Sequence, residues 1–175
     1  MSRSDEAPDF AEPIEAWRAW RVVRRDERFV LGSIIQRVTW PPGRALKATC
    51  LRRPTLLSRL RRKDVHESPR ESCECGIYAT SIDHVAFYLS ETPRTSAGRV
   101  FGLVALWDTV VECERGYRAA QAYPTRIYVP DDASHSSEDG WEEIAFGLQH
   151  YGVPIEPIAA RSRDAVSVIA EHLAA

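Results

Sequence analysis

The longest apolar stretch of the sequence predicts its central strand. Residues 99–114, RVFGLVALWDTVVECE, carry apolar side chains at both alternating sets of positions. A strand that is apolar on both faces is expected to be covered on both faces, as central strands are. At about 3.3 Å per residue, a straight strand of this length would overshoot a small domain, so we expect a bend at Gly102 or Asp108. A turn at residues 114–116 then predicts further strand up to residue 129, which completes a long curved hairpin.

Two shorter strands are expected before this hairpin. Residues 16–23, AWRAWRVV, end in β-branched side chains, although the spacing of Trp17 and Trp20 also suits a helical turn. We interpret this segment as a strand that follows a short turn. Residues 29–40, FVLGSIIQRVTW, are rich in β-branched and aromatic side chains and stop at a Pro-Pro-Gly turn, which predicts a strand bent at Gly32.

Helical patterns follow the strands. Ser81 is placed to cap a short helix over residues 82–89, and residues 141–151 have apolar side chains at three- and four-residue spacing before Gly152. Ser162 is placed to cap a final helix. Strands first and helices last predict an α+β fold, with a small curved β-sheet or partly open barrel and two C-terminal helices.

Composition places this fold in a single domain. The chain has 175 residues, of which 44% are hydrophobic and 27% are charged, as in ordinary globular proteins. Residues 1–13 are polar, contain two prolines and show no periodicity, so we expect a flexible leader followed by one α+β domain over residues 14–175. The net charge of −2 argues against the whole chain acting as a polycation toward nucleic acid.

The sequence also favours a cytoplasmic protein that does not enter a membrane. The first residues lack the basic and apolar regions of a signal peptide. The longest apolar run, residues 100–107, is far shorter than the roughly 20 residues that span a bilayer. Four cysteines are too few for a disulfide scaffold, so reduced thiols are expected.

Three cysteines and one histidine form a candidate zinc site. Cys50, His66, Cys73 and Cys75 supply the sulfur and imidazole donors that tetrahedral zinc prefers. Four protein ligands leave no position for water, so such an ion would be structural. Gly76 allows the positive φ that a turn around an ion requires. Two alternatives remain open: a redox or disulfide role for the C-x-C pair, and ordinary buried thiols beside a surface histidine.

Part of this region resembles known sequences. Residues 66–79, HESPRESCECGIYA, and residues 116–124, GYRAAQAYP, resemble a set of uncharacterised bacterial proteins with an H-x-x-P-x-x-x-C-x-C-G-I-Y-A signature. The likeness covers roughly residues 40–130. It implies no activity, but it implies that His66, Cys73 and Cys75 form a unit.

A basic arm, residues 51–63, lies between the first two candidate ligands. Its basic side chains are Arg52, Arg53, Arg59, Arg61, Arg62 and Lys63. Three interpretations remain open: the arm binds phosphates of a nucleic-acid or other anionic ligand, it docks on the acidic residues 131–143 of this chain or of a protein partner, or it is solvated surface. The interleaved residues are leucines rather than the aromatic side chains that stack on bases, which disfavours single-strand binding. The oligomeric state is not predicted.

A second candidate site lies after the predicted hairpin turn. Arg118, flanked by Tyr117 and Tyr123, would suit an anion, or it would be a buried arginine that satisfies backbone carbonyls. Cys113 has acidic neighbours in the sequence, which disfavours a nucleophile and favours packing.

Two functions follow from these features. The first is a non-enzymatic, zinc-stabilised binding or adaptor module that presents the basic arm, or the rim at residues 117–118, to a ligand. The second is a small enzyme with a cleft between the hairpin at residues 99–129 and the C-terminal helices. The candidate polar groups of that cleft are Arg118 together with Glu112, Glu114 or His84.

Overall fold

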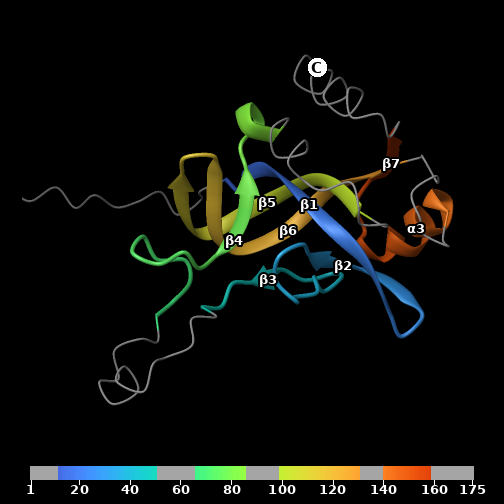
Figure 1. The fold of residues 1–175 in the computed structure, drawn as a ribbon, viewed down its shortest axis with the longest axis horizontal. Coiled ribbons are helices and arrows are strands. Elements are labelled where there is room, and N and C mark those ends of the chain that lie inside the picture. Colours follow the sequence, from blue (N-terminus) through green and yellow to red (C-terminus); the bar gives the residue numbers. More distant parts are fainter. Residues whose placement is uncertain (1–11, 51–65, 86–98, 131–139, 159–175) are drawn as a thin grey trace, which may run out of the picture.

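The structure is a computed structural model that describes residues 12–50, 66–85, 99–130 and 140–158 (Figure 1). Its regular elements are β1 (Ile14–Arg25), β2 (Arg28–Ser33), β3 (Leu46–Lys47), β4 (Ile77–Thr80), β5 (Arg99–Cys113), β6 (Gly116–Pro130), α3 (Trp141–Leu148), the 3₁₀ turn η1 (Gln149–Tyr151) and β7 (Ile155–Ile158). Residues 82–85 are also helical. The described part of the chain is therefore mostly β, with only short helices.

The strands form one mixed sheet that curls into a partial ring (Figure 1). β1 pairs with β5 on one side and with β4 on the other, and β6 pairs with the same two strands. The side through β4 is the weaker one, because β1 meets β4 only at Trp17 and Thr80. The expected curved sheet is thus present, and it forms a partial ring.

The prediction that β5 is central is confirmed. β5 pairs with β1 from Arg99 to Leu106 and with β6 over almost its whole length. Its register against β6 shifts between Trp107 and Val110, and Asp108 between them has a φ of 66°. Aspartate is one of the few residues that tolerate this left-handed region, so the strand is irregular at Asp108. A second register shift lies between Leu103 and Val104, close to the other expected position, Gly102.

The alternation of buried side chains explains why β1 is a strand rather than a helix. Ala16 and Trp20 face the larger core, whereas Trp17 and Ala19 face a second cluster. This period of two matches the pleat of a strand that is covered on both faces. In the larger core the rings of Trp20 and Trp40 meet edge to face, with centroids 5.5 Å apart. In the second cluster Trp17 stacks on Tyr128.

The structure differs from the predicted pattern at three places. β2 ends at Ser33, and the following residues bend outward, so that Ile35 is 95% exposed before Thr39 bridges back to Gly32. A short strand that the sequence pattern did not predict, β7, pairs in parallel with β6. The predicted helix over residues 141–151 is divided into α3 and η1, and it ends as expected at Gly152, with a φ of 68°.

Other predicted segments lie outside the described residues. They are most of the leader, the basic arm, the end of the helix predicted over 82–89 and the final helix from Ser162. No helix within the described ranges combines the length and the apolar character needed to cross a bilayer.

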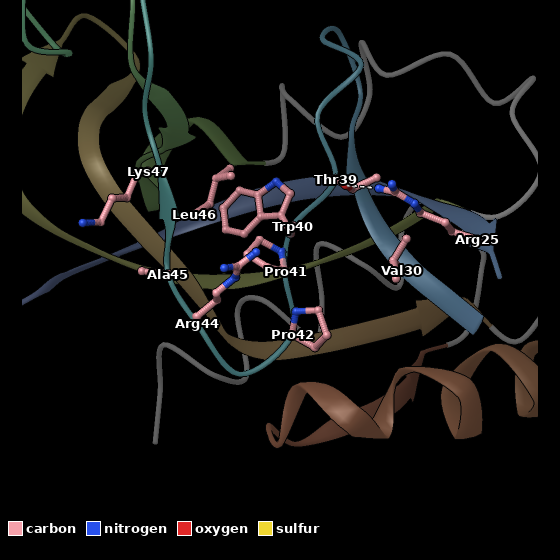
Figure 2. Close-up of a pocket in the computed structure, with 10 residues that line it drawn as sticks. All are labelled: Arg25, Val30, Thr39, Trp40, Pro41, Pro42, Arg44, Ala45, Leu46 and Lys47. Atoms are coloured by element: carbon pink, nitrogen blue, oxygen red, sulfur yellow. Dashed lines mark hydrogen bonds between the residues drawn. The ribbon is translucent and has the colours of Figure 1, made fainter. Parts of the chain in front are cut away.

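An open groove of about 650 Å³ lies on the side of β2 and β3 (Figure 2). Its lining residues are Arg25, Val30, Thr39, Trp40, Pro41, Pro42, Arg44, Ala45, Leu46 and Lys47. The lining includes three cationic side chains and no carboxylate. Figure 2 shows Lys47 and Arg25 toward opposite ends of the labelled row, with Trp40 between them.

A buried tyrosine, Tyr151 of η1, is bonded to Trp40, which lines this groove. The Tyr151 hydroxyl accepts a hydrogen bond from the Leu31 backbone N–H at 2.8 Å and donates one to the Trp40 carbonyl at 2.7 Å. Burial raises the pKa of Tyr151 to about 12, so the hydroxyl keeps its proton and remains a donor at neutral pH. The two bonds connect η1 to β2 and to the segment that follows it.

We predict that Tyr151→Phe lowers the free energy of unfolding by about 1–3 kcal/mol, because it leaves the Leu31 N–H and the Trp40 carbonyl buried without this partner. Chemical denaturation measures the change. The matched control is Tyr117→Phe, since Tyr117 packs against the same core and has no hydroxyl bond to another described residue. Equal stability of the two variants would contradict the role of the Tyr151 hydroxyl.

Candidate metal centre

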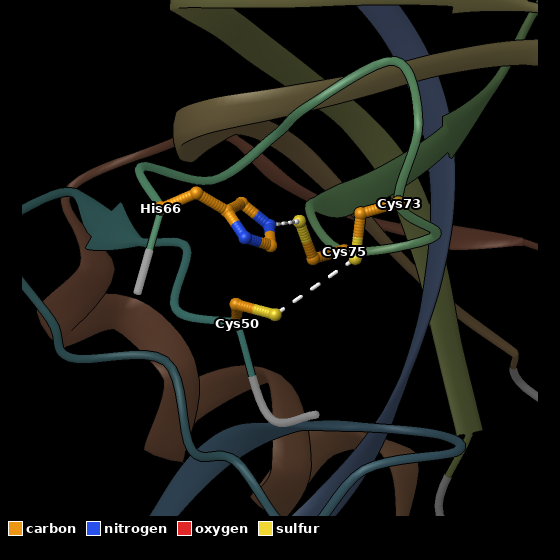
Figure 3. Close-up of side chains that lie close together, drawn as sticks. All are labelled: Cys50, His66, Cys73 and Cys75. Atoms are coloured by element: carbon orange, nitrogen blue, oxygen red, sulfur yellow. Dashed lines mark hydrogen bonds between the residues drawn. The ribbon is translucent and has the colours of Figure 1, made fainter. Parts of the chain in front are cut away.

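The four predicted ligands converge although they come from separate parts of the chain. The ligand atoms of Cys50, His66, Cys73 and Cys75 all lie within 4.8 Å of one another. Figure 3 shows their side chains pointing toward a common centre. These residues form a Cys₃His group that could hold a metal ion.

The sheet explains this convergence. β3 and β4 both pair antiparallel with β6, one after the other along the same strand: Lys47 lies opposite Gln121, and Ile77 lies opposite Ala119. The Ala48 N–H, directly after β3, donates to the carbonyl of Ala120 between these positions. The end of β3 and the start of β4 therefore lie next to each other along β6. Cys50, three residues after β3, is in this way brought close to the residues that precede β4.

Two distances in the cluster are close to those around a tetrahedral ion. Cys50 Sγ lies 3.8 Å from Cys73 Sγ, and His66 Nε2 lies 3.2 Å from Cys75 Sγ (Figure 3). Thiolates at about 2.3 Å and an imidazole at about 2.0 Å from a tetrahedral zinc are separated by about 3.8 Å and 3.5 Å respectively. All four cysteines are free thiols in this structure, so the C-x-C pair does not form a disulfide here.

The two thiols of the C-x-C pair have different proton affinities. Burial alone would raise the pKa of Cys75, but the neighbouring Ser68, His66 and Cys73 side chains, together with the Arg70 backbone N–H, lower it to about 6. The backbone N–H of Cys75 lowers the pKa of Cys73, yet burial and the neighbouring thiols raise it above its ordinary value overall. Metal ligation requires thiolates, and Cys75 is the one that the protein already favours in that form.

Ser68 supplies a buried polar group beside this cluster. Its Oγ is buried and has no partner within ordinary hydrogen-bond geometry among the described residues, although it acts on the pKa of Cys75 from nearby. Buried hydroxyls are normally satisfied. A metal-bound thiolate is the kind of acceptor that an outer hydroxyl commonly supports.

The turn that carries Cys73 and Cys75, residues 70–76, is called here the ligand turn. The Cys73 N–H donates to the Arg70 carbonyl at 3.0 Å, which closes the turn. Gly76 has a φ of 131°, as expected from the sequence, and a Cβ at this position would lie 2.9 Å from Cβ of Arg118. Only glycine combines this backbone conformation with such a close approach to β6.

Arg118 lies directly behind the ligand turn. It is 7% exposed, and its Nη1 donates to the carbonyls of Arg70, Cys73 and Cys75. Its Nε donates to Sγ of Cys113 at 3.2 Å. Of the two interpretations of Arg118, the structure shows the one in which a buried arginine satisfies backbone carbonyls. Cys113, expected as a packing residue, is its partner.

The other candidate residues do not converge with Arg118. Tyr117 packs against the larger core, Glu112 and Glu114 are exposed, and His84 has its Nδ1 3.0 Å from Oγ of Ser81. None of them lines the groove of Figure 2. The remaining candidates, Arg59, Arg61, Arg62 and Lys63 of the basic arm, lie outside the described residues.

Two contributors to the centre were not identified from the sequence. The Tyr78 hydroxyl donates to the Glu74 carbonyl, between the two thiol ligands, at 2.6 Å. Ser68 lies beside Cys75. Both residues stand inside the HESPRESCECGIYA stretch, which is the signal that marks them, but only the fold shows what they contact.

No protein-family model, no curated protein and no solved structure matches this chain. The functional argument therefore depends on the geometry of the described residues.

We predict that Gly76→Ala lowers the free energy of unfolding by more than about 2 kcal/mol, because a side chain there adds a clash with Arg118 to an unfavourable positive φ. Gly43→Ala is the matched control: Gly43 also has a positive φ, 71°, but no atom lies near its added Cβ. We expect it to cost only about 1–2 kcal/mol, the penalty of the conformation alone. Denaturation of both variants measures the difference, and equal losses would show that the close approach to β6 is unimportant.

Proposed function

We propose that this protein is a non-enzymatic binding or adaptor module, stabilised by one structural zinc ion held by Cys50, His66, Cys73 and Cys75. One observation carries the proposal: four donor atoms from three separate segments lie within 4.8 Å of one another. The pairing of β3 and β4 with β6 brings Cys50 and the C-x-C pair to the same point, and His66 joins them there.

The donor set supports zinc and a structural role. Three thiolates and one imidazole are soft and borderline ligands, which zinc prefers over calcium or magnesium. Four protein ligands complete a tetrahedral shell, so no coordination position remains for water or a substrate. When bound, the ion would supply binding free energy that also stabilises the fold.

The same ion would fix both ends of the basic arm. Cys50 and His66 are the last described residue before residues 51–65 and the first one after them. A metal bound to both would close the intervening segment into a loop, and its binding free energy would offset the entropy that closure costs. The arm carries six basic residues, so a polyanion with closely spaced phosphates would be a suitable partner.

We predict that the protein purified from cells contains about one zinc per chain, measured by elemental mass spectrometry. Cys73→Ser and Cys75→Ser should lower both the zinc content and the free energy of unfolding, the latter by at least about 2 kcal/mol, because binding at a structural site is coupled to folding. Cys113→Ser is the matched control and should keep full zinc content, since Cys113 is not one of the four clustered residues. Metal-free wild-type protein whose melting is unchanged by a chelator would refute the zinc site.

We predict that the basic arm binds nucleic acid through its phosphates. The logarithm of the affinity should fall with the logarithm of salt concentration by about 0.7–0.9 per phosphate neutralised. Reversing Arg59, Arg61 and Arg62 to Glu should weaken binding to all sequences alike, because phosphate contacts carry no base specificity. Gel retardation with duplex and single-stranded probes at low salt measures this.

A second triple reversal controls for net charge in that assay. Arg24, Arg28 and Arg37 are exposed, and reversing them to Glu changes the total charge by the same amount. It should leave most of the affinity in place. If neither probe binds the wild-type protein at micromolar concentration, the arm does not bind nucleic acid, and a protein partner or solvated surface takes its place.

A further inference from the structure

Arg118 is a buried cation without a carboxylate partner among the described residues. It is 7% exposed, and its hydrogen bonds go to three backbone carbonyls and to the sulfur of Cys113. A guanidinium stays protonated throughout the ordinary pH range, so Arg118 carries a positive charge. A buried charge is costly unless a group of opposite charge lies nearby, and neutral carbonyls offset only part of that cost.

The metal centre would supply the missing negative charge. A divalent ion bound by three thiolates and a neutral imidazole carries one net negative charge. Arg118 donates to the carbonyls of both Cys73 and Cys75, so its guanidinium lies next to two of the ligands. One buried positive charge and one net negative charge would then balance across the ligand turn.

The same contacts hold the shape of the ligand turn. Arg118 of β6 donates hydrogen bonds to the carbonyls of Cys73 and Cys75. The hydroxyl of Tyr78, in β4, donates to the carbonyl of Glu74, which lies between them. Three successive carbonyls of the turn are thus bound by side chains of the sheet. A turn anchored in this way has less freedom to lose when it takes up an ion, which favours binding.

We propose that Arg118 is the positioning residue and the countercharge of the metal centre. Its guanidinium fixes the ligand turn on β6 and offsets the negative charge that thiolate ligation creates. The proposal rests on the zinc site proposed above. It assigns to Arg118 a role in metal affinity and coordination geometry, in place of a role in binding an external anion.

The test compares Arg118→Gln and Arg118→Lys with the wild-type protein and with Arg126→Gln. Arg126 is the matched control because it lies on the same strand, and its ion pair with Glu156, 2.5 Å long, is remote from the four ligands. Zinc affinity is measured in competition with a chromophoric chelator, and the site geometry is followed by the visible absorption bands of bound Co²⁺.

We expect Arg118→Gln to bind zinc about 10–100-fold more weakly, the usual cost of losing a group that supports metal ligands, and to change the cobalt bands. Arg118→Lys keeps the charge but loses the planar fork, so it should recover part of the affinity. Arg126→Gln should match the wild-type protein in both measurements.

The outcomes separate this inference from the zinc site itself. If the wild-type protein binds no zinc, the proposed function fails and this inference fails with it. If the wild-type protein binds zinc but Arg118→Gln has the same affinity and cobalt spectrum, only the role of Arg118 is refuted. If Arg118→Gln does not fold, Arg118→Lys decides: a wild-type affinity and an unchanged spectrum would overturn the positioning role.

Discussion

The architecture depends on the pairing of a single strand, β6, with four others. One edge of β6 pairs with β5, while β4, β3 and β7 follow one another along its other edge. Such crowding is possible because β3 and β4 are short and β7 runs in parallel at the far end. The order along β6 decides where each connecting segment leaves the sheet. It is this order, rather than any property of the cysteines, that brings Cys50 to the ligand turn.

A metal at this position would strengthen the weakest part of the ring. β4 has four residues, and its strand pairing with β1 is limited to Trp17 and Thr80, whereas β5 pairs extensively with both β1 and β6. The ligand turn leads directly into β4, and Arg118 ties that turn to β6. An ion that fixes the turn would therefore also fix the start of β4, and its binding free energy would act where strand pairing contributes least.

The sequence predicts the parts of this molecule that depend on local patterns. The hairpin of β5 and β6 follows from apolar alternation, and a bend at Gly102 or Asp108 follows from the length of a strand that would otherwise overshoot the domain. The four candidate ligands were identifiable because soft donors are rare in this chain. Each of these inferences uses only neighbours in the sequence and the chemistry of one residue type.

The remainder depends on pairing between distant segments. β3 has two residues, too few for any periodicity, and it exists because Leu46 and Lys47 lie opposite residues of β6. β7 requires a partner strand that is already in place. Trp107 of β5 is only partly covered, and a register shift that follows it interrupts the pairing with β6. The partners of Arg118 are likewise set by register, because every residue has a backbone carbonyl and residue types do not show which carbonyls a side chain contacts.

The position of Arg118 also determines where recognition of a ligand can take place. A guanidinium that is buried and bonded to the ligand turn is not available to an external anion, so the rim at residues 117–118 loses its main binding group. Two exposed cations lie on the segment that leads to the first ligand: Arg44 and Lys47 line the groove, and Cys50 follows three residues after Lys47. The basic arm begins immediately afterwards in the sequence. An ion at Cys50 would anchor the boundary between these two basic segments, and a polyanionic partner that engages the arm would find the cations of the groove on the same stretch of chain.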